Sequence, residues 1–354
     1  MSDELQQHRT RIDALDDEIL KLVNERAEHA QAIGALKNGV VYRPEREAQV
    51  LRRVMENNPG PLANETVARL FREVMSACLA LEKPLDVAYL GPQGTFTQAA
   101  AIKHFGHAAK TEACTSIDEV FRKVEAGMAD YGVVPVENST EGAVSRTLDL
   151  LLASSLKICG EVDLRVHQFL LRKCEGLQGI VRVYSHAQSL GQCHEWLNKN
   201  LPGVPRIPVA SNAEAARLAA EDSSSVAIAG EMAAELYSLH QLARNIEDEP
   251  NNTTRFLVIA QHDAARSGID KTSLVMTANN QPGAIVELLS PLAANQVSMT
   301  KLESRPSRMG LWEYVFFVDI EGHQQDEKVA QALLDLKDKA AFLKVLGSYP
   351  VAVL

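Results

Sequence analysis

The residues that most clearly indicate chemistry are two cations on the apolar side of a predicted helix. Residues 4–37 repeat apolar side chains at helical spacing. Arg26 falls in the apolar row, and Lys37 lies only ~20° around the helix from it, at ~100° per residue. Cations on a buried stripe need an anionic partner, so the pair predicts an anion site. Arg9 lies ~100° from Arg26 and presents a third cation to a different place.

A second set of polar residues follows short apolar strands from residue 85 onward. Strand, loop and helix patterns alternate there, as they do in α/β proteins. Such folds bind ligands at the carboxyl ends of strands, facing helix N-termini. The loops are rich in Ser, Thr, Asn and Gly, which suits an anionic substrate. They cover residues 91–95, 137–142, 185–189 and 211–212.

Three predicted domains position these residues. Residues 1–84 have the pattern of three helices, of which the first loses its signal at 38–39 and the third runs over 64–82. Residues 85–265 carry the α/β pattern. After a polar linker, residues 268–354 follow the order strand, helix, strand, strand, helix, strand, which is typical of a ferredoxin-like α+β unit. The prediction is a multidomain chain with an all-α, an α/β and an α+β part.

Composition excludes several classes of protein. The 354 residues are 46% hydrophobic and 23% charged, as in ordinary globular proteins, and the net charge of −10 argues against nucleic acid as a partner. No apolar run reaches the ~18 residues of a membrane span, and no signal peptide pattern opens the chain, so we expect a cytoplasmic protein. The five cysteines form no CxxC pair, and no phosphate-loop motif is present. We therefore predict no metal and no cofactor.

Three stretches together resemble one enzyme family, the bifunctional chorismate mutase–prephenate dehydratases of bacterial phenylalanine biosynthesis. The helical part is similar to the all-helical mutases. The middle is similar to the dehydratases through residues 91–96, 134–139 and 254–256, and the end is similar to ACT regulatory domains through 282–286 and 303–306. The resemblance implies a two-lobed, periplasmic-binding-protein-like dehydratase domain. It also implies a homodimer, with a tetramer as the alternative.

The mutase resemblance implies a site shared between paired chains. Chorismate is a dicarboxylate that rearranges without covalent help, so the enzyme must clamp it and stabilise charge on the breaking ether oxygen. By resemblance, Arg9 and Arg26 hold the carboxylates, and Lys37 donates to the ether oxygen. Glu47 meets the substrate hydroxyl. The implied set is Arg9, Arg26, Lys37, Arg43, Arg46, Glu47, Cys78 and Glu82.

Three positions depart from the family pattern. Glu82 stands where enterobacterial relatives carry Gln, and a carboxylate can donate a hydrogen bond only when it is protonated. Our hypothesis is that apolar surroundings hold Glu82 neutral, or that mutase activity rises toward acid pH. Cys78 replaces a substrate-touching Ser, and Arg43 falls where Asp is usual. Backbone groups could serve at both of these positions.

The dehydratase resemblance makes Thr254 the essential residue. Loss of carbon dioxide and water from prephenate requires a proton donor near the ring hydroxyl. A threonine hydroxyl is a weak acid, so we interpret Thr254 as a positioned hydrogen-bond donor, with Arg255 and Phe256 shaping the site. The predicted set is Asn138, Ser139, Thr140, Ser185, His186, Gln188, Ser211, Thr254, Arg255 and Phe256.

The ACT resemblance implies phenylalanine as an allosteric effector, bound where Gly283 opens a helix and leaves backbone N–H groups free. The implied set is Pro282, Gly283, Ala284, Ile285, Val286, Glu303, Ser304, Arg305 and Pro306. Two alternatives stay open. One is a monofunctional dehydratase whose mutase module only dimerises, and the other is an amino-acid-sensing binding protein.

Overall fold

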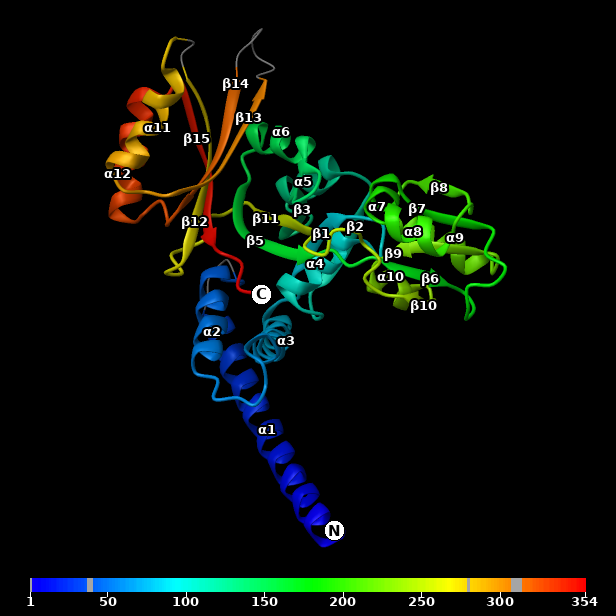
Figure 1. Cartoon of the computed structure of the whole chain (residues 1–354). Helices are drawn as coiled ribbons and strands as arrows, with labels where there is room; N and C mark the ends of the chain where they lie inside the picture. The colour runs from blue at the N-terminus through cyan, green and yellow to red at the C-terminus, as the bar shows by residue number, and fades with distance from the viewer. Residues whose placement is uncertain (1, 37–40, 279–280, 307–313) are drawn as a thin grey trace.

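A computed structural model of the chain shows three units in sequence order (Figure 1). It describes residues 2–36, 41–278, 281–306 and 314–354. Three helices come first, two α/β lobes follow, and a four-stranded sheet with two helices comes last. This order confirms the predicted multidomain fold. Within the described ranges, no helix is long and apolar enough to span a membrane.

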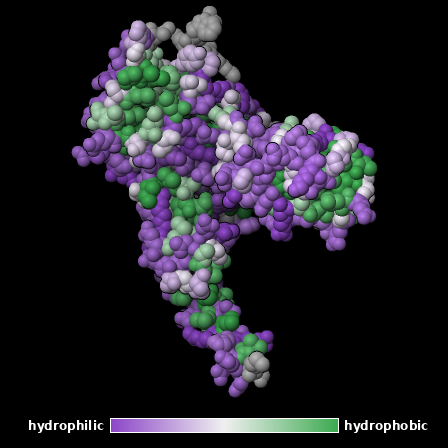
Figure 2. Space-filling model, in the orientation of Figure 1, coloured by the Kyte–Doolittle hydropathy of each residue, from purple (hydrophilic) through white to green (hydrophobic). Residues whose placement is uncertain are grey.

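The first unit consists of α1 (Ser2–Leu36), α2 (Pro44–Glu56) and α3 (Asn64–Glu82). α3 packs against both other helices, whereas the amino-terminal half of α1 projects away from the chain (Figure 1). The α1 stripe is exposed in the single chain, where Leu5, Ile12 and Ile19 are 52%, 55% and 57% exposed, and its burial against a second copy stays a prediction. Figure 2 shows hydrophobic patches along this helix. An exposed apolar stripe of this length marks an interaction surface.

The middle unit has two lobes, each built on one mixed sheet. Lobe 1 has the strand order β2-β1-β3-β11-β5, with β4 paired to β3, and lobe 2 has the order β10-β6-β9-β7-β8. The chain passes between the lobes twice, after β5 and before β11. The lobe 1 strands are β1 (Asp86–Leu90), β2 (Lys110–Cys114), β3 (Tyr131–Asn138), β4 (Gly142–Ala143), β5 (Lys157–Arg165) and β11 (Thr253–Ala260). The lobe 2 strands are β6 (Phe169–Arg172), β7 (Arg182–His186), β8 (Arg206–Val209), β9 (Ser225–Ala229) and β10 (His240–Ala243).

Side-chain caps begin the helices that start near the strand ends. The Thr95 hydroxyl accepts from the Gln98 N–H at the start of α4, and Ser211 accepts from Glu214 at the start of α9. Thr95 follows β1 and Ser211 follows β8, so both capped helices begin directly after a strand end. The helices of the two lobes are α4 (Phe96–Phe105), α5 (Ile117–Glu125), α6 (Ser145–Ala153), α7 (Ala187–Gln192), α8 (His194–Asn200), α9 (Asn212–Glu221) and α10 (Glu231–Leu236).

The C-terminal domain is a sheet of order β13-β14-β12-β15, as the predicted ferredoxin-like unit requires. Helices α11 and α12 bury one of its faces, and the other face shares a hydrophobic core with lobe 1. β15 crosses β5 so closely that a Cβ at Gly347 would lie 2.1 Å from the Ile158 carbonyl oxygen. Only glycine permits that approach. The elements are β12 (Asp270–Thr277), α11 (Ala284–Ala294), β13 (Met299–Pro306), β14 (Tyr314–Glu321), α12 (Glu327–Lys339) and β15 (Phe342–Pro350).

Candidate active sites

A cleft of about 720 Å³ lies between the two lobes. Its walls are the loops after β1, β3, β7 and β8, together with the start of β11, so the predicted strand ends do meet at one place. Five of the predicted dehydratase residues line it. These are Asn138, His186, Gln188, Ser211 and Thr254.

The best-defined contact in the cleft joins Asn138 to Thr254. The Asn138 Oδ1 accepts from the Thr140 N–H at 3.0 Å, the Thr140 hydroxyl at 2.7 Å and the Glu141 N–H at 3.1 Å. These three donors fix the amide, so its Nδ2 faces the other way and donates to the Thr254 Oγ1 at 2.8 Å. The Thr254 oxygen is thus an acceptor, and its own proton is left for an acceptor in the cleft.

Three predicted residues support the cleft without lining it. Thr140 holds the Asn138 amide, and Ser139 exchanges hydrogen bonds with the backbone of Thr253. Ser185 is fully buried, and its hydroxyl lies 3.0 Å from the Asn212 Oδ1 and 2.8 Å from the Ile228 carbonyl. The Thr140 hydroxyl also accepts from the Gln192 Nε2 of lobe 2 at 3.2 Å, so Thr140 joins the two lobes beside the cleft. Direct substrate contact by these three residues stays a prediction.

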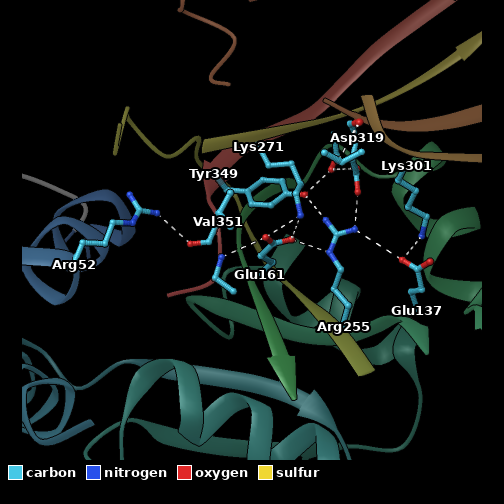
Figure 3. Close-up of polar contacts among 12 residues, drawn as sticks. Arg52, Glu137, Glu161, Arg255, Lys271, Lys301, Asp319, Tyr349 and Val351 are labelled. Atoms are coloured by element: carbon cyan, nitrogen blue, oxygen red, sulfur yellow. Dashed lines mark hydrogen bonds and ion pairs between the residues drawn. The ribbon is translucent and has the colours of Figure 1, made fainter. Parts of the chain in front are cut away.

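Arg255 and Phe256 require a second correction, because neither side chain lines the cleft. Successive strand residues point to opposite faces, so Arg255 leaves the sheet on the side away from Thr254. It meets Glu161, Asp319 and Tyr349 at the C-terminal domain instead (Figure 3). Burial alone would lower the pKa of Arg255, but these partners raise it. Phe256 shares the face of Thr254 but lies further along β11, in the core beneath α4.

Most of the remaining cleft wall lies outside the predicted site residues, although the predicted loops contain Gly91, Pro92, Thr95, Ser189 and Asn212. Asn252 and Gln168 lie on the two crossings between lobes, and Asn212 accepts from the backbone N–H of His186 at 3.0 Å. The position of Asn212 after a predicted strand was a usable sequence signal. No local sequence pattern indicates that Gln168 and Asn252 lie where the chain passes between the lobes. Other lining residues are Leu90, Gly91, Pro92, Thr95, Phe96, Thr97, Thr115, Val166, Ser189, Gln192, Val209, Ala210 and Glu214.

Neutral groups dominate the electrostatics of the cleft. Among the lining residues that the structure describes, only His186 and Glu214 have ionisable side chains. An anion entering here would meet hydroxyls, amides and the helix N-termini that Thr95 and Ser211 cap, rather than lysine or arginine. Such a site binds carboxylates through directed N–H and O–H donors.

The predicted mutase residues differ in their exposure within the single chain. Arg9, Arg43 and Arg46 are exposed, and Lys37 lies outside the described residues. The Arg26 Nη1 is buried and has no hydrogen-bond partner among the residues that the structure describes. Cys78 is buried in α3.

Glu82 lies against the C-terminal part of α1. A Cβ at Gly34 would be 2.6 Å from the Glu82 Cγ, so the two helices touch at this point. This is the part of α1 that leads toward Lys37. The single chain therefore places the Glu82 side chain beside α1, the helix that carries the predicted cations.

Glu47 lies beside the buried residues of α2, which are Pro44, Ala48 and Leu51. Its carboxylate forms an ion pair with Arg72 of α3 at 3.3 Å, beside lobe 1 and the C-terminal tail. Burial raises the pKa of Glu47, against the lowering effect of Arg72. In the single chain Glu47 therefore contacts Arg72, and its binding of the substrate hydroxyl stays a prediction.

The predicted effector residues fall into two groups. Gly283 has a left-handed φ of +80° before α11, and Ile285 and Val286 are exposed beside it. Ser304 and Pro306 are also exposed, on β13. Arg305 instead donates to the Ser145 carbonyl and pairs with Asp149 at 3.2 Å. Side chains alternate along β13, so Arg305 and Glu303 point toward lobe 1, whereas Ser304 points to the exposed face. Arg305 therefore connects the C-terminal domain to lobe 1.

Fold and cleft together define the class of the protein: a multidomain chain with a two-lobed α/β unit around a central cleft, a helical module before it and a ferredoxin-like unit after it. Family models match three segments, chorismate mutase type II at residues 8–83, prephenate dehydratase at 87–264 and the ACT domain at 272–338. A bifunctional chorismate mutase/prephenate dehydratase of Neisseria gonorrhoeae is 61% identical over 351 residues, which cover 98% of this chain and 97% of that protein. The chain belongs to the bifunctional chorismate mutase/prephenate dehydratase family.

Two solved structures share the fold. A prephenate dehydratase of Arthrobacter aurescens in complex with L-Phe has a TM-score of 0.69 and 34% identity, covering 75% of this chain and 90% of that one. GqqA, described as a quorum-quenching acylase, has a TM-score of 0.69 and 30% identity, covering 76% of this chain and 98% of that one. The shared fold therefore does not select an activity. The mutase match and the full-length relative favour the bifunctional interpretation over a monofunctional dehydratase. The boundaries 1–84, 85–265 and 268–354 stay a prediction.

Proposed function

We propose that the cleft between the lobes is the prephenate dehydratase site and that Thr254 is its hydrogen-bond donor to the departing hydroxyl. The observation that carries this assignment is the bond from the Asn138 Nδ2 to the Thr254 Oγ1, because it leaves the threonine proton to the substrate. Loss of carbon dioxide then supplies the electron pair that expels the ring hydroxyl, and the ring becomes aromatic. His186, Gln188 and Ser211 are within the same cleft and bind the carboxylates of prephenate.

We propose further that chorismate binds between α1 to α3 of one chain and α1 of a second copy. Two observations support a shared site. The apolar stripe of α1 is exposed, and the Arg26 Nη1 is buried without a hydrogen-bond partner among the described residues. Arg26 and Arg9 would hold the two carboxylates, while Lys37 and Glu82 would donate to the ether oxygen.

Phenylalanine is the proposed effector of the C-terminal domain. The exposed backbone around Gly283 and the outward side of β13 at Ser304 offer the surface, and an amino acid there would have to bind two conformations unequally to inhibit. Isothermal titration with phenylalanine tests the site. Unchanged affinity after Gly283→Val, in a folded protein, would count against it.

The dehydratase assignment is tested with Thr254→Ala and the neighbouring variant Thr253→Ala. Thr253 is one residue earlier on β11, and its hydroxyl donates to the Asn251 carbonyl at 3.2 Å. With prephenate as substrate, we expect Thr254→Ala to lose phenylpyruvate formation, and Thr253→Ala to keep it. With chorismate as substrate, both variants should consume it at the wild-type rate. Near-normal dehydratase turnover in Thr254→Ala would refute the role of Thr254.

A further inference from the structure

The two strands that carry Asn138 and Thr254 have a second, opposite face. In the antiparallel pair of β3 and β11, Thr254 lies opposite Asn138, and Arg255 lies opposite Glu137. Because side chains alternate along strands, the first pair faces the cleft and the second pair faces away from it. Arg255 and Glu137 are therefore the covalent neighbours of the cleft residues, on the back of the same two strands.

All four strands of the C-terminal sheet reach this back face. Asp319 of β14 accepts from the Arg255 Nη1 at 2.5 Å, and Lys301 of β13 donates to the Glu137 Oε2 at 2.7 Å. Tyr349 of β15 accepts from the Arg255 Nη2 at 2.8 Å, while Lys271 of β12 pairs with Glu161 of β5. Figure 3 shows these side chains converging on Arg255, Glu161 and Glu137.

The charges of this cluster balance, and all of its members except Glu137, whose side chain is 38% exposed, are largely buried. The cations are Arg255, Lys271 and Lys301, and the anions are Glu137, Glu161 and Asp319. The side chains of Glu161 and Asp319 are only 1% and 9% exposed. Charges removed from water stay stable only while their partners hold close geometry, so any displacement of the sheet from lobe 1 carries a large cost. The C-terminal sheet thus fixes the position of the β3–β11 pair.

We propose that Asp319 and Lys301 are positioning residues of the dehydratase. They hold Arg255 and Glu137 on the back of β11 and β3, and thereby fix the distance between the Thr254 Oγ1 and the Asn138 amide in the cleft. The inference rests on the proposed role of Thr254. It assigns to the C-terminal domain a part in the dehydratase step itself.

The test compares two lysines of the C-terminal sheet that both contact lobe 1. Lys301 reaches Glu137, whereas the Lys344 Nζ donates to the Leu151 and Leu152 carbonyls, each at 2.9 Å, near the end of α6. α6 carries no residue that lines the cleft. Lys301→Met and Lys344→Met each remove a cation between the same two domains, and only the first touches a strand that carries a cleft residue.

With prephenate as substrate, Lys301→Met and Asp319→Asn should lower dehydratase kcat about tenfold, with KM within about twofold of wild type. Lys344→Met should stay within about twofold in both constants. Lys301→Arg, which keeps a cation near Glu137, should restore most of the lost kcat. Mutase turnover of chorismate should be unchanged in every variant, which also shows that the chain is folded.

Equal kcat values for Lys301→Met, Asp319→Asn and Lys344→Met would overturn the proposal. A rise in KM without a fall in kcat, or no recovery in Lys301→Arg, would do the same, since either result indicates a general loss of packing. Failure of the underlying assignment has a different signature, namely an active Thr254→Ala. An inactive Thr254→Ala together with a normal Lys301→Met would reject only the positioning role.

Discussion

Acidification should loosen the contact between the helical unit and lobe 1 through His104. This side chain is buried on α4, and its Nε2 lies 3.0 Å from the hydroxyl of Tyr42, just before α2. Burial, and then the nearby Arg72, lower the pKa of His104 from 6.5 to about 3. The ring is therefore neutral in the folded chain over the whole range in which a histidine in the unfolded chain takes up a proton.

The sign and size of the effect follow from proton linkage. Between pH 6.5 and 3 the unfolded chain binds more protons at this site than the folded chain. The contribution of His104 to the free energy of unfolding is therefore fully present above pH 6.5 and is lost as the pH falls. At 1.36 kcal/mol per pH unit, lowering the pH from 7 to 5 should cost about 2 kcal/mol at this one site.

The assay is urea unfolding followed by circular dichroism at both pH values, with hydrogen exchange of peptides from α4 as the local probe. His104→Gln keeps a hydrogen-bonding group near Tyr42 but cannot titrate, so it should lose about 2 kcal/mol less than wild type on acidification. His8→Gln is the control, because it removes an exposed histidine on the amino-terminal half of α1, which projects away from the chain. It should follow wild type. Identical pH dependence in wild type and His104→Gln would refute the reasoning.

Three further predictions concern the other units. Ile19→Glu puts a charge on the exposed stripe of α1, and sedimentation should show that the dimer becomes a monomer. The variant should lose mutase activity and keep dehydratase activity. A monomer with full mutase activity would contradict the shared site. Gly347→Ala places a methyl group within 2.1 Å of the Ile158 carbonyl oxygen and should lower the free energy of unfolding by about 3 kcal/mol. The change should appear as a lower Tm. An unchanged Tm would show that β15 and β5 can move apart to accept the methyl group. Glu82→Gln supplies a permanent donor and should make mutase turnover independent of pH between 5 and 8, whereas wild type gains activity toward pH 5. Flat profiles in both would reject only the acid-dependent version of the Glu82 hypothesis.

Local pattern was enough for most elements and for part of the cleft. The amphipathic repeat of residues 64–82 predicted α3 with the bounds that the structure has, and the strand-end position of Asn138, His186 and Ser211 predicted their meeting. Both predictions succeed because they depend on spacing that every residue of an element shares. Glu47 shows where this reasoning stops, because its partner Arg72 lies on another helix and nothing in the local spacing indicates which face of α2 is covered.

By itself, the sequence determined the kinds of element, their order, the family and the residue types available for chemistry, since these follow from periodicity and composition. Only the tertiary structure decided which side of each element is buried and against what. Thr254 and Arg255 are adjacent in sequence, yet one faces the cleft and the other faces the C-terminal sheet. The reason is that alternation in a strand separates neighbours onto opposite faces, while long-range packing chooses what each face meets.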